Sequence, residues 1–568
     1  MLELAHQYLI SPFLEEELRE ELLAIVGAAK GGDINARADL SDRFSGSLSF
    51  GTGGLRGKMG AGSARMNKPN IRRASLALAE VAQQYSPNSN TVLIGYDTRL
   101  KSGTFALETA RAFAAQGFMA YLGDRPLPTP FLCYAMRKLG VSCGVIITAS
   151  HNPKIYNGYK AYNNLGAQLV PPWDKEVEAA IERLPMIPPA LTNEFDARII
   201  AIPKPVEEDF YAMSLGVLAH PEHFISARIL FAALHGTGSE FVPELFRRAG
   251  LPLDICKTQA VQDGNFPTAP RPNPEEMAAF KTPIEDAERL GNEAILGTDP
   301  DADRLGVIIK HQGQWLPLSG NDMAALALDY LAIERQVKGA VITTVVTSDF
   351  LARVACMHQM PVVWTLTGFK NIAACMQDLA LRHEPFALGA EESMGLCPLG
   401  EVRDKDGVTA ALLLAEMIGY YKAKGQTLHE AVATLKERAG VFYTRLVNLE
   451  DSSFEGTKRF SQAMVKLRKS KITIFADQRV ISYEDYLAGQ RITENGQEDL
   501  LDRPDCPEIA KPIPQANLLK FYLEDGSFIA FRPSGTEPKL KIYLQSRSTA
   551  EYLDLMEQEA RGFLDQQF

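Results

Sequence analysis

The sequence predicts an α/β protein built from several domains. Its 568 residues exceed what one hydrophobic core usually organises, and 46% of them are hydrophobic, which is enough for more than one core. From about residue 91 to about residue 436, short apolar segments typical of strands alternate with segments typical of helices. Such repeated βα units favour mixed or parallel sheets flanked by helices. After about residue 440 the pattern changes to strands and loops, with a final helix expected over 549–566.

The first 45 residues resemble a helical lead-in, in which the acidic stretch 14–21 is expected to be a solvated face. Beyond it, apolar runs bounded by Gly, Asn and Asp predict strands. The strands are expected at 91–97, 142–148, 228–234 and 293–298, and helices near 103–116 and 239–249. The stretch 491–516 is rich in Asp, Glu and Pro and is expected to be an exposed loop.

Three blocks of βα units and the change of pattern near residue 440 predict four domains. We place these domains at 1–204, 205–320, 321–438 and 439–568. The first three are expected to be mixed sheets sandwiched between helices, with the lead-in attached to the first. The last is expected to be an α+β domain.

The composition argues against a nucleic-acid or membrane partner. Lys and Arg number 59 against 70 Asp and Glu, and the net charge of −11 argues against nucleic acid. The seven cysteines include no CxxC pair and form an odd set, which favours reduced thiols in the cytoplasm. The first residues lack a basic region and a cleavage pattern, and Glu416 interrupts the apolar stretch 408–421. We therefore expect neither a signal peptide nor a membrane span.

A serine is expected on a tight loop after a buried strand. Residues 143–149 read CGVIITA, and residues 150–153 read SHNP. The loop would lie at the carboxyl end of the strand, where open α/β sheets bind ligands. Ser150 could carry a phosphoryl group there. The alternative is that Ser150 and His151 only hydrogen-bond to the local backbone.

Three carboxylates follow another short apolar strand. Residues 299–304 read DPDADR, so that Asp299, Asp301 and Asp303 repel one another unless a cation neutralises them. Mg²⁺ is commonly held by a few carboxylates and substrate phosphate oxygens. A calcium-binding EF-hand loop is excluded, because its sixth and twelfth positions hold Arg304 and Lys310. A solvated acidic turn remains the alternative.

Two turns that are rich in glycine or proline could bind an anion. Residues 51–58 read GTGGLRGK, which fails the P-loop pattern because Thr52 replaces the first glycine and Met59 replaces the Ser/Thr. The loop still offers backbone amides beside Arg56, although an ordinary glycine-rich turn is equally consistent. Residues 531–539 read FRPSGTEPK, placing Arg532 and Lys539 around hydroxyl groups and exposed amides between two strand-like segments. This combination predicts phosphate binding.

Paired carboxylates follow a third apolar run. Residues 386–395 read FALGAEESMG, with Glu391 and Glu392 adjacent to Ser393. Such a pair could be a catalytic acid and base, as in glycoside hydrolysis. It could equally accept hydrogen bonds from sugar hydroxyls, or form the acidic first turn of a helix.

Taken together, these motifs resemble the α-D-phosphohexomutase superfamily. Four segments are similar to its phosphoserine, metal, sugar and phosphate loops, and they occur in the family's order: 148–153, 299–304, 389–393 and 532–536. Shorter similarities lie at 50–57, 95–99, 235–238, 272–275 and 404–407, so the resemblance covers nearly the whole chain. The length, the sequence TGFK at 367–370 and the two glutamates before Ser393 look most like the long phosphoglucomutase/phosphopentomutase branch. Asn371 departs from the aromatic residue more usual there.

The resemblance implies a four-domain phosphohexomutase-like architecture and a phosphosugar mutase. Such an enzyme moves a phosphoryl group between C1 and C6 of a hexose phosphate, foremost glucose 1-phosphate and glucose 6-phosphate. The reaction would pass through phospho-Ser150 and glucose 1,6-bisphosphate, with Mg²⁺ held by Ser150, Asp299, Asp301 and Asp303. Alternative activities are phosphopentomutase, phosphomannomutase and glucose-1,6-bisphosphate synthase. A non-catalytic phosphoprotein that keeps the fold for binding is a remote alternative.

The resemblance also assigns roles to single residues. Lys160 would be the general base, if cations such as Arg56 and Arg304 lower its pKa, and His151 is a second candidate. The substrate is expected to be a small-molecule sugar phosphate. Its binding residues would be Thr52, Thr367, Gly368, Lys370, Glu391, Ser393, Arg532, Ser534, Gly535, Thr536 and Lys539.

Overall fold

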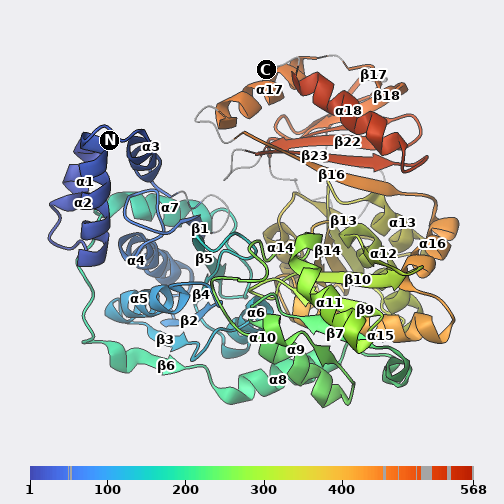
Figure 1. The fold of residues 1–568 in the computed structure, drawn as a ribbon, viewed down its shortest axis with the longest axis horizontal. Helices are drawn as coiled ribbons and strands as arrows, with labels where there is room; N and C mark the ends of the chain where they lie inside the picture. Colours follow the sequence, from blue (N-terminus) through green and yellow to red (C-terminus); the bar gives the residue numbers. More distant parts are fainter. Residues whose placement is uncertain are drawn as a thin grey trace. The chain divides into compact units, whose positions relative to one another are not determined.

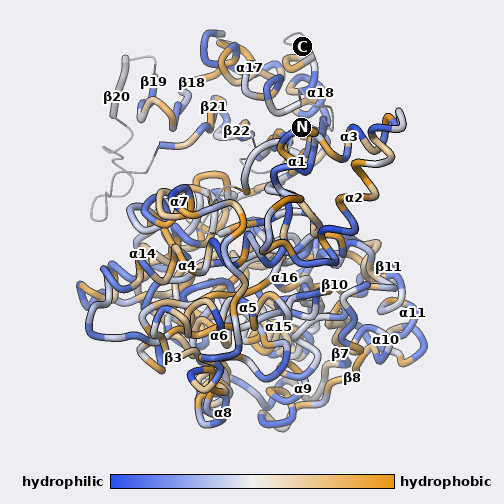
Figure 2. The backbone as a smooth tube through the Cα atoms, turned by 90° about the vertical axis from the view of Figure 1, so that its left-hand side faces the viewer, coloured by the Kyte–Doolittle hydropathy of each residue, from blue (hydrophilic) through white to orange (hydrophobic). Residues whose placement is uncertain are grey.

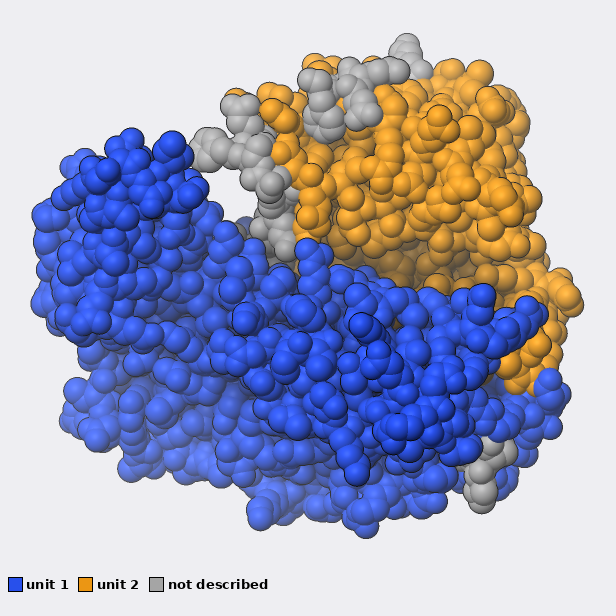
Figure 3. All heavy atoms as spheres, viewed as in Figure 1, with its two compact units in different colours: residues 1–317, 395–425 blue, residues 318–394, 426–568 orange. Residues whose placement is uncertain are grey.

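The computed structural model of the protein describes residues 1–48, 50, 54–451, 456–470, 472–493, 496–499, 515–533 and 539–565. The chain forms two compact units, which are coloured separately in Figure 3. Unit 1 comprises Met1–Pro317 with Gly395–Gly425, and unit 2 comprises Leu318–Met394 with Gln426–Phe568. The predicted fold class is confirmed, because the α/β domains carry mixed or parallel sheets and the last domain carries an antiparallel one (Figure 1).

The first sheet of unit 1 carries the serine loop. Its strand order is β1-β5-β4-β2-β3-β6, and β5 runs antiparallel to both of its neighbours. Strand β4 is buried along its whole length, because its sequence CGVII has no charged side chain. The strands are β1 Gly54–Lys58, β2 Thr91–Tyr96, β3 Met119–Leu122, β4 Cys143–Ile147, β5 Tyr156–Asn163 and β6 Ile199–Ala201. The helices are α4 Lys68–Tyr85, α5 Ser102–Ala115, α6 Thr129–Leu139 and α7 Trp173–Arg183, of which α4, α5 and α7 share an apolar core with the sheet.

The helical lead-in forms its own small core from α1 Leu2–Leu9, α2 Glu16–Lys30 and α3 Ile34–Arg43. Within the acidic stretch 14–21, Glu16, Glu17 and Glu20 are exposed, as expected of a solvated face, but the stretch as a whole is not solvated. Leu14 and Leu18 are buried, and the Glu21 carboxylate accepts a hydrogen bond of 2.7 Å from Arg43. In Figure 2, α2 and α18 carry hydrophobic and hydrophilic colours along their length, as expected for helices with one buried face.

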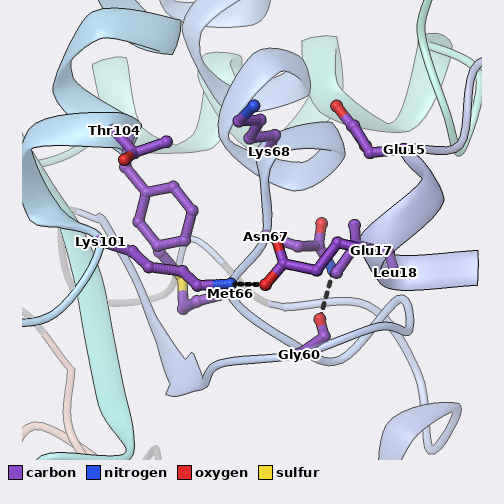
Figure 4. Close-up of a pocket in the computed structure, with 10 residues that line it drawn as sticks. Glu15, Glu17, Leu18, Gly60, Met66, Asn67, Lys68, Lys101 and Thr104 are labelled. Atoms are coloured by element: carbon purple, nitrogen blue, oxygen red, sulfur yellow. Dashed lines mark hydrogen bonds and ion pairs between the residues drawn. The ribbon is translucent and has the colours of Figure 1, made fainter. Parts of the chain in front are cut away.

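A pocket of about 140 Å³ lies between α2 and the first turns of α4 and α5 (Figure 4). Its wall includes an ion pair of 2.6 Å between Lys101 and Glu17 and a hydrogen bond of 2.9 Å from Asn67 to the Gly60 carbonyl. None of the residues that line this pocket belongs to the predicted site.

The second sheet of unit 1 carries the aspartate loop and has the order β11-β10-β9-β7-β8. Its strands are β7 Ile229–Ala232, β8 Asp254–Ile255, β9 Ala294–Thr298, β10 Leu305–His311 and β11 Gln314–Pro317. Helix α15 packs on β9, β10 and α9, although it follows the sugar loop in sequence. The helices are α8 Lys204–Leu215, α9 Gly238–Ala249, α10 Lys257–Ala260, α11 Lys281–Leu290 and α15 Gly407–Ala423, with short 3₁₀ turns at η1 Asp196–Arg198, η2 Pro221–Ser226 and η3 Met277–Phe280. The same unit holds the short strand β15 Gly395–Cys397.

Unit 2 begins with a parallel sheet in which β12 pairs with both β13 and β14. The strands are β12 Ala340–Thr344, β13 Val362–Thr365 and β14 Phe386–Glu391. The accompanying helices are α12 Gly320–Glu334, α13 Asp349–Met357, α14 Phe369–Leu381 and α16 Leu428–Ala439.

The C-terminal part of unit 2 is an antiparallel sheet in the order β16-β23-β22-β21-β18-β19-β20, covered by α17 and α18. Its strands are β16 Tyr443–Glu450, β17 Ile474–Phe475, β18 Gln478–Asp485, β19 Gln490–Thr493, β20 Gly496–Asp499, β21 Leu519–Leu523, β22 Phe528–Pro533 and β23 Lys539–Ser546. The helices are α17 Gly456–Lys469 and α18 Tyr552–Asp565, so the expected final helix is confirmed. The expectation of one exposed loop over 491–516 is wrong at its start, where β19 and β20 pair as a hairpin. Among the described residues, no helix combines the length and the hydropathy that a membrane crossing requires.

Candidate active site

Ser150 occupies a strained turn immediately after β4. Its φ of 49° lies in the left-handed region, which a serine rarely adopts. The turn is held by a hydrogen bond of 2.8 Å from the Ser150 amide to Thr148 Oγ1, and by Arg99, whose guanidinium donates to the carbonyls of Ser150 and Asn152. The expected tight loop is therefore present, and Ser150 Oγ lies 3.1 Å from His151 Nδ1.

Asp299, Asp301 and Asp303 form a buried carboxylate cluster at the end of β9. One oxygen from each lies within 4.8 Å of the others. Asp299 Oδ2 accepts a hydrogen bond of 2.7 Å from Ser150 Oγ, and Asp299 Oδ1 accepts from the amides of Asp303 and Arg304. Burial, followed by repulsion from the other two carboxylates, raises the pKa of Asp299 well above its usual range. The three carboxylates repel one another, and a bound cation would relieve that repulsion.

The donor set fits a hard divalent metal ion. Asp301 Oδ1 and Asp303 Oδ1 are buried and find no hydrogen-bond partner among the described residues. An ionised carboxylate oxygen can only accept, so leaving two such oxygens unpaired in the interior is unfavourable unless a cation or a donor meets them. Oxygen-only clusters of this kind are the ligands that Mg²⁺ prefers. The group could therefore hold a metal ion.

Lys160 lies against these carboxylates. Its Nζ atom is 2.8 Å from Asp301 Oδ2 and 3.1 Å from Asp303 Oδ2. Burial alone would lower the pKa of Lys160, but Asp301, Asp303 and Asp404 outweigh it and raise that pKa above its ordinary value. The expectation that neighbouring cations lower the pKa of Lys160 is thus wrong in this arrangement, because carboxylates dominate its surroundings.

The two arginines expected to act on Lys160 act on His151 instead. Burial, followed by Arg304 and Arg56, lowers the pKa of His151 well below its usual range. Arg56 also donates a hydrogen bond of 3.1 Å to Asn152 Oδ1, and Arg304 pairs with Glu275 at 3.0 Å. At neutral pH the His151 imidazole is therefore neutral, as a proton acceptor must be.

Three further residues complete this part of unit 1. Thr129 Oγ1 donates a hydrogen bond of 3.1 Å to Asp301 Oδ2, Lys405 Nζ lies 3.1 Å from Asp303 Oδ2, and Arg99 holds the serine turn. Arg99 and Lys405 lie in two of the shorter similar segments, 95–99 and 404–407, which could have indicated them. Thr129 carried no such signal.

The predicted sugar-binding residues gather in unit 2. Glu391 ends β14, and its Oε1 atom accepts a hydrogen bond of 2.7 Å from the Gly368 amide. Gly368 has a φ of 111°, which suits glycine, and it precedes α14. The segment with Thr367, Gly368 and Lys370 thus contacts the loop that contains Glu391 and Ser393. Asn371 Nδ2 donates to the carbonyls of Leu366 and Thr367, each at 3.2 Å, and so secures the same segment.

The phosphate loop is described only at its ends. Arg532 lies near the end of β22, and Lys539 begins β23 and pairs with Glu450 at 3.1 Å. Burial, followed by Glu392, raises the pKa of Tyr543 above its usual range, while Arg532 opposes this shift. Tyr543 therefore lies close to both the sugar loop and Arg532, which the sequence did not indicate. Thr52, Ser534, Gly535 and Thr536 lie outside the described residues.

Comparison with known proteins identifies the family of this chain. Residues 47–186, 217–313 and 319–438 match the models of the phosphoglucomutase/phosphomannomutase alpha/beta/alpha domains I, II and III. Residues 490–562 match the C-terminal domain of the same family. The chain belongs to the phosphoglucomutase/phosphomannomutase family. The resemblance to the α-D-phosphohexomutase superfamily is thereby confirmed, and the chain is a phosphosugar mutase.

The family assignment is supported by relatives matched along most of the chain. A phosphoglucomutase of Staphylococcus epidermidis is 32% identical over 523 residues, which cover 90% of this chain and 92% of the relative. A phosphoglucomutase of Staphylococcus aureus is 32% identical over 518 residues, covering 89% of this chain and 91% of the relative. The crystal structure of a phosphoglucomutase/phosphomannomutase family protein from Burkholderia thailandensis has the same fold. It has a TM-score of 0.65 and 18% identity, and it covers 91% of this chain and 97% of that one.

Proposed function

We propose that this family member is a phosphoglucomutase that interconverts glucose 1-phosphate and glucose 6-phosphate through phospho-Ser150 and glucose 1,6-bisphosphate. The observation that carries the proposal is the hydrogen bond of 2.7 Å from Ser150 Oγ to Asp299 Oδ2. It joins the hydroxyl of Ser150 to a carboxylate cluster suited to a divalent cation. The curated relatives named phosphoglucomutase support glucose as the sugar.

In the first half-reaction, the bond between phosphorus and Ser150 Oγ breaks as a bond forms to the free hydroxyl of the sugar monophosphate. The hydroxyl proton passes to a base, for which His151 and Lys160 are the candidates. His151 is neutral and lies next to Ser150, whereas Lys160 must first lose a proton. After the bisphosphate turns around, Ser150 Oγ takes the other phosphoryl group, as the bond from phosphorus to the sugar oxygen breaks and the base returns its proton to that oxygen.

Asp299, Asp301, Asp303 and an oxygen on Ser150 would hold Mg²⁺. When bound, the ion supplies the charge neutralisation that phosphoryl transfer chiefly needs. Thr129 and the amides of Asp303 and Arg304 hold the carboxylates of Asp301 and Asp299. One oxygen from each aspartate of the cluster lies within 4.8 Å of the others.

Unit 2 would hold the parts of the substrate that do not react. We assign the sugar hydroxyls to Glu391 and Ser393, with the segment of Thr367, Gly368 and Lys370 beside them. Charge-assisted hydrogen bonds to the idle phosphate would come from a second group, namely Arg532, Ser534, Gly535, Thr536 and Lys539. Because this division separates holding from transfer, the same residues can serve both ends of the sugar.

Two further assignments belong to the proposal. We place the domain limits near residues 204, 320 and 438, supported by the separate sheets along the chain.

We also propose a cytoplasmic location. Within the described part of the chain, the cysteines are free thiols, as expected in a reducing compartment.

A substrate panel tests the proposed reaction. The purified protein is given glucose 1-phosphate, mannose 1-phosphate or ribose 1-phosphate with Mg²⁺ and a trace of glucose 1,6-bisphosphate, and kcat/KM is compared. We expect glucose 1-phosphate to give the highest value. A higher value for ribose or mannose 1-phosphate would assign the chain as a phosphopentomutase or a phosphomannomutase instead. In a further assay that adds an acyl phosphate as phosphoryl donor to glucose 1-phosphate, net formation of glucose 1,6-bisphosphate without mutase turnover would identify a synthase.

A further inference from the structure

A second group of metal-ligating side chains lies in unit 1, around the short turn η2. His220, Glu222 and His223 each offer one ligand atom, and these three atoms lie within 4.8 Å of one another. None of the three belongs to the predicted active site. His220 and His223 are half-buried, and Glu222 is exposed.

The backbone of this group is fixed by a buried carboxylate on α15. Glu416 has no exposed surface, and it accepts hydrogen bonds from the amides of Ala219 at 2.8 Å and His220 at 2.5 Å. A buried carboxylate whose partners are backbone amides holds those amides firmly, because losing them would leave the charge unpaired. The turn that carries the histidines is thereby anchored to a helix.

The imidazole rings are oriented by packing on a single aromatic side chain. The His220 ring stacks on Tyr420 at 6.1 Å between centroids and 23° between planes, and the His223 ring meets Tyr420 edge-on at 5.8 Å. The two imidazoles themselves are 5.6 Å apart. The rotamers that bring the ligand atoms together are therefore supported by contacts outside the group.

The chemistry of this group differs from that of the aspartate cluster. Two imidazole nitrogens and one carboxylate oxygen suit borderline divalent ions such as Zn²⁺, whereas oxygen-only sets suit Mg²⁺. His220 Nδ1 and Glu222 Oε1 are 3.1 Å apart. Neighbouring ligands of a tetrahedral zinc ion stand about 3.3 Å apart, given metal–ligand distances of about 2.0–2.1 Å.

We propose that His220, Glu222 and His223 form a binding site for a borderline divalent transition-metal ion of the Zn²⁺ type, with three protein ligands and one open position. The site is separate from the carboxylate cluster and differs from it in ligand chemistry.

Equilibrium dialysis of the full-length protein against Zn²⁺, followed by elemental analysis, tests the site. Millimolar Mg²⁺ is kept throughout, so that Zn²⁺ does not enter the aspartate cluster. We expect the wild type to retain one more Zn²⁺ per chain than His223→Gln. Glu222→Gln should weaken zinc binding by about 10-fold or more, as losing one ligand removes an anionic donor. The control variant His6→Gln removes an exposed histidine from α1 and should bind zinc like the wild type.

Folding is checked by circular dichroism and by Mg²⁺-dependent mutase activity, neither of which should change in these variants. Should His223→Gln fail these checks, the exposed and nearly isosteric Glu222→Gln decides the question alone. Equal zinc content and affinity in the wild type and the folded variants would overturn the site. So would an equal loss of zinc in His6→Gln.

Discussion

The Oγ atom of Ser150 donates a hydrogen bond of 2.7 Å to Oδ2 of Asp299, which lies 149 positions later in the chain. The two residues follow strands of different sheets, β4 and β9, yet both belong to unit 1. The residues proposed to transfer the phosphoryl group are thus assembled in one compact unit. Those proposed to hold the sugar and the idle phosphate belong mostly to unit 2. Substitutions in the two groups should therefore have different kinetic signatures.

Replacement of Ser150 by alanine should abolish phosphorylation of the protein and nearly all mutase activity. Without Oγ there is no acceptor for the phosphoryl group, and we expect kcat/KM to fall by on the order of 10³ or more. Intact-mass spectrometry of the wild type incubated with glucose 1,6-bisphosphate should show one phosphate adduct that the variant lacks. The surface variant Ser45→Ala is the control and should keep both the adduct and the activity. An active alanine variant without the adduct would exclude the phosphoserine mechanism.

Removal of divalent metal should stop turnover without unfolding the protein. Asp301 Oδ1 and Asp303 Oδ1 are buried acceptors that lack hydrogen-bond partners within the described structure. These two oxygens are therefore available to coordinate a divalent cation. We expect EDTA to abolish activity and Mg²⁺ to restore it, with little change in the circular dichroism spectrum. Asp301→Asn should raise the Mg²⁺ concentration for half-maximal activity by at least the roughly 10- to 100-fold that is lost when a residue supporting a metal ligand is replaced. Full activity in excess EDTA would contradict the metal assignment.

Asp406 should make the stability of the protein depend on pH. Burial raises the pKa of this N-cap residue of α15 from 3.8 to about 6, although Thr409 donates to both of its oxygens. The folded state therefore binds the proton more tightly than the unfolded state. Its stabilisation is fully present below pH 3.8 and is lost as the pH rises through about 6. At about 1.36 kcal/mol per pKa unit, the free energy of unfolding should fall by about 3 kcal/mol over this window.

The variant Asp406→Asn isolates this contribution, because it keeps a capping oxygen but cannot titrate. Urea unfolding is followed across the window, and the stability of the variant relative to the wild type should rise with pH. Asp33→Asn replaces the exposed N-cap of helix α3 and serves as the matched control. Parallel stability curves for the wild type and Asp406→Asn would show that burial of Asp406 has no such effect.

Much of the fold and the core of the site could be predicted from the sequence. The strands β7 and β9 fall inside their expected segments, because each apolar run is short and clearly bounded, by Arg228 and Gly236 around β7 and by Asn292 and Asp299 around β9. Ser150 and Asp299 each follow such a strand, and strand ends are where open sheets gather their ligands.

The remaining features depend on tertiary contacts that no local pattern records. Thr129 reaches Asp301 across 172 positions, and nothing around Thr129 distinguishes it from any other residue that begins a helix. The sequence motifs place cations near Lys160 and so predict a lowered pKa for it. The carboxylates of Asp301 and Asp303, 141 and 143 positions away, face it instead and reverse the shift.

Replacement of Arg532 by alanine should weaken binding and leave transfer intact. Arg532 is assigned to the phosphate that does not react, and a charge-assisted hydrogen bond contributes about 1.5–3 kcal/mol. The KM for glucose 1-phosphate should therefore rise by about 10- to 100-fold. Phospho-Ser150 should still form when glucose 1,6-bisphosphate is supplied in excess, as judged by intact mass. Arg479→Ala, an exposed arginine of the same domain, is the control.

Replacement of Lys160 by alanine should have the opposite signature. If Lys160 accepts the hydroxyl proton, the variant should bind sugar phosphate nearly normally but turn over about 10² to 10⁴ times more slowly. The assay needs saturating Mg²⁺, because removing Lys160 also takes a counter-charge from Asp301 and Asp303. Lys175→Ala, an exposed lysine on α7, is the matched control. A change in KM alone would remove Lys160 from the transfer step. The neutral, adjacent His151 would then be left as the base, and His151→Ala should show the slow turnover instead.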